Sequence, residues 1–95
     1  MSGLPSEVSF CRSDDQVFAE VDGEIIMMDV VSGDYIGLNA VGSSIWGLIE
    51  VPKTLEQICA GLMGEYEIDE QTCRAETEHF LTSMSEKGMI KQNAQ

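Results

Sequence analysis

Basic residues are scarce in this chain. Lysine and arginine together number 5 against 17 aspartates and glutamates, which gives a formal net charge of -12. A protein this acidic repels polyanions, because binding to phosphates depends on Lys and Arg side chains that displace counterions. The composition therefore argues against nucleic acids and anionic membrane surfaces as partners.

Long hydrophobic runs and paired cysteines are also missing. The longest aliphatic run, residues 25–28, is too short for a transmembrane helix, and residues 1–8 lack the basic and apolar parts of a secretory signal. Three cysteines without a C-x-x-C pair indicate reduced thiols in a cytoplasm rather than a disulfide framework. We expect Cys59 and Cys73 to be buried and Cys11 to be exposed.

Catalytic signatures are absent as well. The sequence has no phosphate-binding loop, no G-x-S-x-G motif and no zinc-ligand spacing. His79 is the single histidine and has no Cys or Asp at a metal-ligand spacing, which indicates a solvent-facing helix residue. A chain of 95 residues forms one small domain with little room for a deep pocket. We therefore expect no catalytic residue, no metal site and no cofactor.

Residues 16–39 carry the signals of β-strands joined by tight turns. Asp22-Gly23 lies between two β-favouring runs, which is the strongest short-range signal of a hairpin, and Ser32-Gly33 indicates a second turn. We therefore predict an antiparallel three-stranded meander, with strands at residues 17–21, 25–30 and 35–38.

The ends of the chain are less regular. We expect residues 1–15 to be a flexible N-terminal segment, residues 16–90 to be the folded domain and residues 91–95 to be a C-terminal tail. Val8 and Phe10 alternate in a way that leaves one further edge strand open within the first segment.

From Asn39 onward the apolar spacing is helical. Asn39 is predicted to cap a helix that Pro52 ends, and Thr54-Leu-Glu-Gln57 has the form of a capping box for a second helix. Asp69 is predicted to cap a third helix over residues 70–87. A three-stranded β-meander followed by three α-helices makes an α+β domain similar to a winged helix-turn-helix.

A winged helix-turn-helix suggests DNA binding, but the charge of the third helix argues against it. A recognition helix needs Lys or Arg near the phosphates. Between Asp69 and Lys87 the chain has five acidic residues and two basic ones. We expect no nucleic acid as a partner.

An ordered set of short motifs resembles the PqqD family. The motifs are D-G-E-I-I-M-M-D (22–29), S-G-D-Y-I-G-L-N (32–39), I-W (45–46), T-L-E-Q-I (54–58), Y-E-I-D (66–69) and F-L with G-M-I (80–90). That family comprises small peptide chaperones, or precursor-peptide recognition elements, of ribosomally made and post-translationally modified peptides. The resemblance covers residues 17–90, and each motif alone is generic.

The resemblance implies a non-enzymatic peptide-binding function. Members bind the leader segment of a precursor peptide as an extra antiparallel strand, in a groove between the third strand and the third helix, and deliver it to a separate modifying enzyme. That partner is a leader peptidase and cyclase in lasso-peptide biosynthesis, or a radical-SAM enzyme in pyrroloquinoline quinone biosynthesis, and residues 35–39 look more like the lasso type. The implied peptide-binding residues are Tyr35, Ile36, Gly37, Leu38, Cys73, Arg74, Thr77, Glu78 and Leu81.

The strand residues by themselves support the same location. The third strand is last in the meander and keeps one free edge unless the N-terminal segment covers it. Alternation puts Tyr35 and Gly37 on one face and Ile36 and Leu38 on the other, without indicating which pair faces the groove.

Two questions stay open for the third helix and for the function. Helical spacing places Phe80 and Met84 in the core and Leu81 near the groove, while Thr77 either faces a peptide or bonds to its own helix carbonyls. The alternatives to leader binding are a generic interaction domain and a small subunit that completes a partner's active site.

Overall fold

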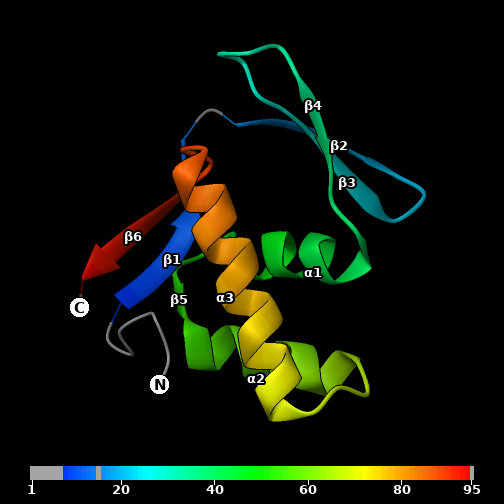
Figure 1. The fold of residues 1–95 in the computed structure, drawn as a ribbon, viewed down its shortest axis with the longest axis vertical. Helices are drawn as coiled ribbons and strands as arrows, with labels where there is room; N and C mark the ends of the chain where they lie inside the picture. The colour runs from blue at the N-terminus through cyan, green and yellow to red at the C-terminus, as the bar shows by residue number, and fades with distance from the viewer. Residues whose placement is uncertain (1–7, 15, 95) are drawn as a thin grey trace.

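The computed structural model describes residues 8–14 and 16–94, which form two small antiparallel sheets and three helices (Figure 1). The α+β class is confirmed, with one sheet more than predicted. The strands are β1 (Val8–Arg12), β2 (Val17–Val21), β3 (Glu24–Met28), β4 (Tyr35–Gly37), β5 (Lys53–Thr54) and β6 (Ile90–Ala94). The helices are α1 (Ala40–Leu48), α2 (Leu55–Glu65) and α3 (Glu70–Glu86).

The predicted meander is the sheet β2-β3-β4. Asp22 and Gly23 both have positive φ, at 54° and 84°, as a two-residue hairpin turn requires. At the other end, the N–H of Asp29 donates to the carbonyl of Asp34 (2.8 Å), and Gly33 supplies another positive φ. β3 ends at Met28, two residues before the predicted end, because this turn already begins at Asp29.

The second sheet has the order β5-β1-β6 and contains both ends of the described chain. β1 pairs with β6 from Val8 opposite Ala94 to Arg12 opposite Ile90. A strand is therefore present at Val8 and Phe10, but it is the central strand of a second sheet and not an edge strand. Its residues were predicted to belong to a flexible segment. Residues 91–94, predicted to be a tail, are part of β6; residues 1–7 lie outside the described residues.

Cys11 was predicted to be exposed, and this was wrong. It lies in β1 and is buried, and the side-chain amide of Asn93 on β6 donates to its sulfur (3.6 Å). The burial of Cys59 and Cys73 is confirmed.

The three helix caps are confirmed. The side chain of Asn39 accepts from the N–H of Gly42 (2.8 Å), and Thr54 forms a reciprocal capping box with Gln57. Asp69 accepts from the N–H of Thr72 (3.1 Å). The hydrogen bonds from Thr72 stabilise the carboxylate and lower the pKa of Asp69 below its ordinary 3.8.

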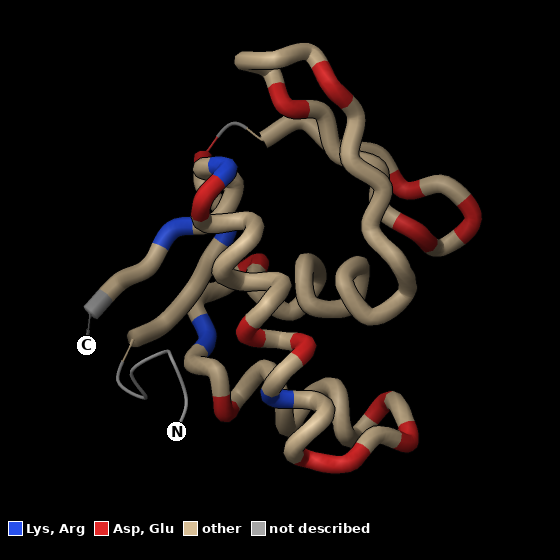
Figure 2. Tube along the Cα trace, in the orientation of Figure 1, with Lys and Arg blue, Asp and Glu red and all other residues tan. Residues whose placement is uncertain are grey.

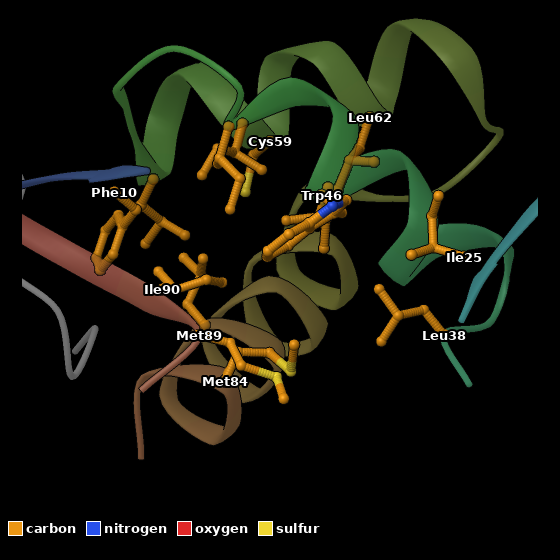
Figure 3. Close-up of a cluster of buried hydrophobic side chains, with 14 of the residues drawn as sticks. Phe10, Ile25, Leu38, Trp46, Cys59, Leu62, Met84, Met89 and Ile90 are labelled. Carbon is orange, nitrogen blue, oxygen red and sulfur yellow. The ribbon is translucent and has the colours of Figure 1, made fainter. Parts of the chain in front are cut away.

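One apolar core joins the sheets to the helices (Figure 3). Phe10 enters it from β1, Trp46 from α1, and Met89 and Ile90 from the end of the chain. The guanidinium of Arg12 lies 4.9 Å from the ring centre of Trp46, and its Nε donates to the Trp46 carbonyl (2.9 Å). Among the described helices, none is long and apolar enough to cross a membrane.

Candidate functional site

β4 is an edge strand, since it pairs only with β3 in the described sheet. The N–H of Leu38 donates to the carbonyl of Ile25 (2.8 Å), and at the other end of β4, on the same edge, the carbonyl of Asp34 accepts from the N–H of Asp29. In an antiparallel ladder, residues bonded to a neighbour alternate with residues whose N–H and C=O point away. Ile36 therefore bonds to β3 as well, whereas the backbone groups of Tyr35 and Gly37 point to the free edge.

A groove of about 450 Å³ lies between β4, the start of α1 and one face of α3. In Figure 1, β4 runs down to the start of α1, and α3 crosses on the other side of α1. Most of the lining side chains are apolar. The apolar ones are Ile36, Leu38, Val41, Ile45, Ala75, Phe80 and Met84. The rest of the lining consists of Gly37, Asn39, Gly42, Glu76, His79, Ser83 and Lys87.

The groove settles which face of β4 is turned inward. Ile36 and Leu38 line it, whereas the side chain of Tyr35 is 74% exposed and lies outside the lining. Gly37 contributes its backbone, and a Cβ built on it would meet no atom within 4 Å. The free edge and the apolar groove are therefore adjacent, and they share the residues of one short strand.

The face of α3 that lines the groove differs from the predicted one. Cys73, Thr77 and Leu81 are fully buried, and the thiol of Cys59 on α2 lies 3.9 Å from the hydroxyl of Thr77. These residues hold α3 against α2, so they are not available to a ligand in the groove. Arg74 and Glu78 are half-buried and do not line the groove.

The relative burial of Phe80 and Leu81 is the reverse of the prediction. Phe80 is only partly buried and lines the groove, whereas Leu81 is completely buried. The aromatic ring is accommodated by Gly42 at the start of α1, where an added Cβ would lie 3.1 Å from Cε1 of Phe80. The close packing of these two residues fixes the wall of the groove at the end of β4.

Several groove residues were not found from the sequence. Val41, Gly42 and Ile45 come from α1, where Gly42 and Ile45 are buried and Val41 is half-buried, and Ala75, Glu76 and Ser83 come from α3. The signal that could have identified the α3 set is the spacing of Glu76, His79, Phe80, Ser83 and Lys87, which places them along one helix face. His79 is exposed, as predicted, and also borders the groove.

Cys59, which lies behind the groove on α2, is not an activated nucleophile. Burial raises the pKa of the Cys59 thiol from its ordinary 9.0 to about 11, so this cysteine is neutral at physiological pH. Within residues 8–14 and 16–94, no group of three or more His, Cys, Asp or Glu could hold a metal ion. The chemistry available at the groove is apolar contact combined with backbone hydrogen bonding, which suits an extended peptide.

Residues 24–90 match the family described as Coenzyme PQQ synthesis protein D (PqqD). The chain belongs to the PqqD family. The resemblance of the sequence motifs to this family is thus confirmed, and the match extends from β3 to the first residue of β6. No curated protein sequence matched the chain.

Two solved structures share the fold of this PqqD-family protein. TbiB1 in complex with the TbiA(beta) leader peptide is 34% identical, with a TM-score of 0.76 over 85% of this chain and 94% of that chain. Lasso peptide synthetase B1 complexed with the leader peptide is 23% identical, with a TM-score of 0.74 over 86% of this chain and 96% of that chain. The second likeness establishes the fold alone.

Proposed function

We propose that this protein binds the leader segment of a ribosomally made precursor peptide as an additional strand on β4 and delivers it to a separate modifying enzyme. The observation that carries the proposal is the free edge of β4, directly beside an apolar groove. The complex of TbiB1 with the TbiA(beta) leader peptide supports the proposal, because TbiB1 is 34% identical over most of both chains.

Backbone pairing alone is too weak to hold a flexible leader. Tyr35 and Gly37 offer one N–H and one C=O each at the edge, and a hydrogen bond contributes about 0.5–1.5 kcal/mol net. Four such bonds give about 2–6 kcal/mol, from which the cost of ordering the peptide must be subtracted. Side chains of the leader must therefore make further contacts with the protein, beyond the backbone bonds to β4.

The groove supplies that second contribution. Alternate side chains of an added strand point to the same face of the sheet as Ile36 and Leu38, and this face borders the groove. The groove wall formed by Phe80 and Met84 suits a large apolar side chain of the leader. A leader recognised here carries apolar residues at alternate positions over a short extended stretch.

The proposed site keeps Tyr35, Ile36, Gly37 and Leu38 from the sequence prediction. Its α3 side consists of the residues that line the groove, with Phe80 and Met84 as the apolar contacts. The predicted contacts of Cys73, Arg74, Thr77, Glu78 and Leu81 with the leader have no support from the groove geometry.

We infer further that the protein has no catalytic activity of its own and works in the cytoplasm, where its three free thiols stay reduced. The favoured partner is the leader peptidase and cyclase of a lasso-peptide pathway, because residues 35–39 look more like the lasso type and the protein shares its fold with a lasso peptide synthetase B1 complexed with the leader peptide. The family description favours a second candidate, a radical-SAM enzyme that modifies a peptide in the pyrroloquinoline quinone manner.

The proposal is tested by titrating the purified protein into fluorescently labelled leader peptide and measuring anisotropy. The leader to be labelled is the N-terminal segment of a short precursor reading frame, to be sought among the genes that neighbour this one. The control is a peptide of the same composition in scrambled order. Saturable one-to-one binding of the leader, with much weaker binding of the scrambled peptide, is expected. Equal binding of both peptides, or of neither, contradicts the proposed function.

A further inference from the structure

The wall of the groove formed by α3 carries two opposite charges. Among the groove residues, Glu76 is acidic and Lys87 is basic, and His79 and Ser83 lie between them along the helix. In Figure 2, blue marks the C-terminal end of α3, and two red segments lie near the middle of the helix. The groove is therefore acidic toward one end and basic toward the other.

Neither charge is paired within the protein. Glu76 and Lys87 are both exposed, and the ion pair found within residues 8–14 and 16–94 joins Lys91 to Asp14. Glu86 precedes Lys87, but consecutive residues of a helix do not face each other, and Glu86 does not line the groove. Both charges are thus available to side chains of a bound peptide.

The spacing of the two charges sets the spacing of their partners. Lys87 follows Glu76 by 11 positions on α3, which at a rise of about 1.5 Å per residue separates them by about 16 Å along the helix. An extended chain rises about 3.3 Å per residue, so the same distance takes about five residues. Oppositely charged residues about five positions apart in a leader can reach both ends of this wall.

The direction of α3 relative to β4 decides the order of these partners. In Figure 1, β4 runs down to the start of α1, whereas α3 rises from the end of α2. Phe80 in the middle of α3 packs on Gly42 of α1, so the part of α3 before Phe80 lies beyond the end of β4. A leader that runs antiparallel to β4 therefore passes Glu76 first and Lys87 second.

We propose that Glu76 and Lys87 select a leader in which a Lys or Arg is followed about five residues later by an Asp or Glu, and that they hold it antiparallel to β4. This inference rests on the proposed function and names the charge pattern of its ligand. Backbone groups at a free edge can pair with a strand of either direction. The two charges distinguish the directions, because a reversed leader brings like charges together at both ends.

The test exchanges the two charges without changing the net charge. The groove variant combines Glu76→Lys with Lys87→Glu, so the chain stays at -12. The control variant combines Glu67→Lys with Lys91→Glu, which makes the same exchange at exposed positions outside the groove. The probes are the labelled leader used to test the proposed function and a second leader whose basic and acidic residues are exchanged.

Anisotropy titrations give four comparisons. Wild-type protein and the control variant should bind the original leader about 2- to 30-fold more tightly than the exchanged leader, and the groove variant should show the opposite preference. The preference should shrink at high salt, because both charges are exposed. A spin label at the N-terminus of the leader should broaden the amide signal of Glu76 more than that of Lys87.

The outcomes separate this inference from the proposed function. Equal binding of both leaders by the wild-type protein overturns the inference, as does a leader that binds saturably without such a charge pair. An unchanged preference in the groove variant, or stronger broadening at Lys87, also overturns it, while leader binding itself stands. The wild-type comparison decides even where thermal melts show that the groove variant is unfolded. Failure of the wild-type protein to bind the leader more tightly than the scrambled peptide contradicts the proposed function.

Discussion

The replacement Gly37→Pro tests the free edge of β4 by removing one backbone N–H. The N–H of Gly37 points away from β3. Leu38 and Asp34 both bond on the β3 side of the strand, and odd-numbered residues of β4 point their backbone groups the other way. Proline removes this donor, and proline is tolerated on edge strands where the N–H faces solvent. The fold should survive, and a leader strand should lose one hydrogen bond.

The magnitude follows from that one bond. A net contribution of about 0.5–1.5 kcal/mol corresponds to an increase of about 2- to 12-fold in the leader Kd. Gly37→Ala is the matched control, since an added Cβ meets no atom within 4 Å and the donor is kept. Ile36→Pro removes the neighbouring donor, which faces Met27 on β3, and should lower the free energy of unfolding by about 1–3 kcal/mol.

The assay is leader anisotropy combined with thermal melts of the three variants. We expect weaker binding with a small change in Tm for Gly37→Pro, unchanged binding for Gly37→Ala, and a clearly lower Tm for Ile36→Pro. The reasoning is refuted if Gly37→Pro binds the leader with wild-type affinity. It is also refuted if Gly37→Pro melts lower than Ile36→Pro, because the alternation along β4 would then be the reverse.

Three further predictions concern packing, pH and salt. Leu81→Ala should lower the free energy of unfolding by about 2–5 kcal/mol, because Leu81 is fully buried, whereas Phe80→Ala should mainly weaken leader binding. Thermal melts and leader titrations on the same samples check this. A stable Leu81→Ala that binds the leader weakly, together with an unstable Phe80→Ala that binds it normally, would contradict the prediction. The free energy of unfolding should fall as pH rises from 9.0 toward about 11, because Cys59 ionises more easily in the unfolded chain. In denaturant titrations over that range, the free energy of unfolding of Cys59→Ala should depend less on pH. With a net charge of -12, the protein should bind a leader carrying Lys or Arg faster at low salt in stopped-flow measurements, and a salt-independent on-rate would contradict this.

Local signals in the sequence predicted most of the meander and all three helix starts. Asn39 and Asp69 cap helices through bonds to residues three positions ahead, and Asp22-Gly23 adopts its turn through its own backbone preferences. Interactions this short in sequence leave a pattern that can be recognised without knowing the rest of the fold.

The second sheet could not be predicted in the same way. β1 and β6 pair across almost the whole length of the chain, from Val8 opposite Ala94 to Arg12 opposite Ile90. Each strand alone has a weak signal, and the burial of Cys11 follows only from the pairing. Sequence patterns do not report which distant strand will be the neighbour.

The face of α3 that lines the groove differs from the predicted one because Phe80 and Leu81 are neighbours at the edge of one apolar stripe. The buried stripe contains Cys73, Thr77, Leu81 and Met84, and helical periodicity alone also permits Phe80 to face the core. Contact of Thr77 with Cys59 on α2 fixes which residues are buried. Only the packing of two helices against each other carries that information.

The central claim is that the leader adds to β4 as a strand, and amide hydrogen exchange measured by NMR tests it most directly. In the free protein, the amides of Ile36 and Leu38 bond to β3 and should exchange slowly, whereas those of Tyr35 and Gly37 point to the free edge and should exchange fast. With saturating leader peptide, we predict that the amides of Tyr35 and Gly37 become protected. Fast exchange of both amides in the saturated complex would contradict strand addition at β4.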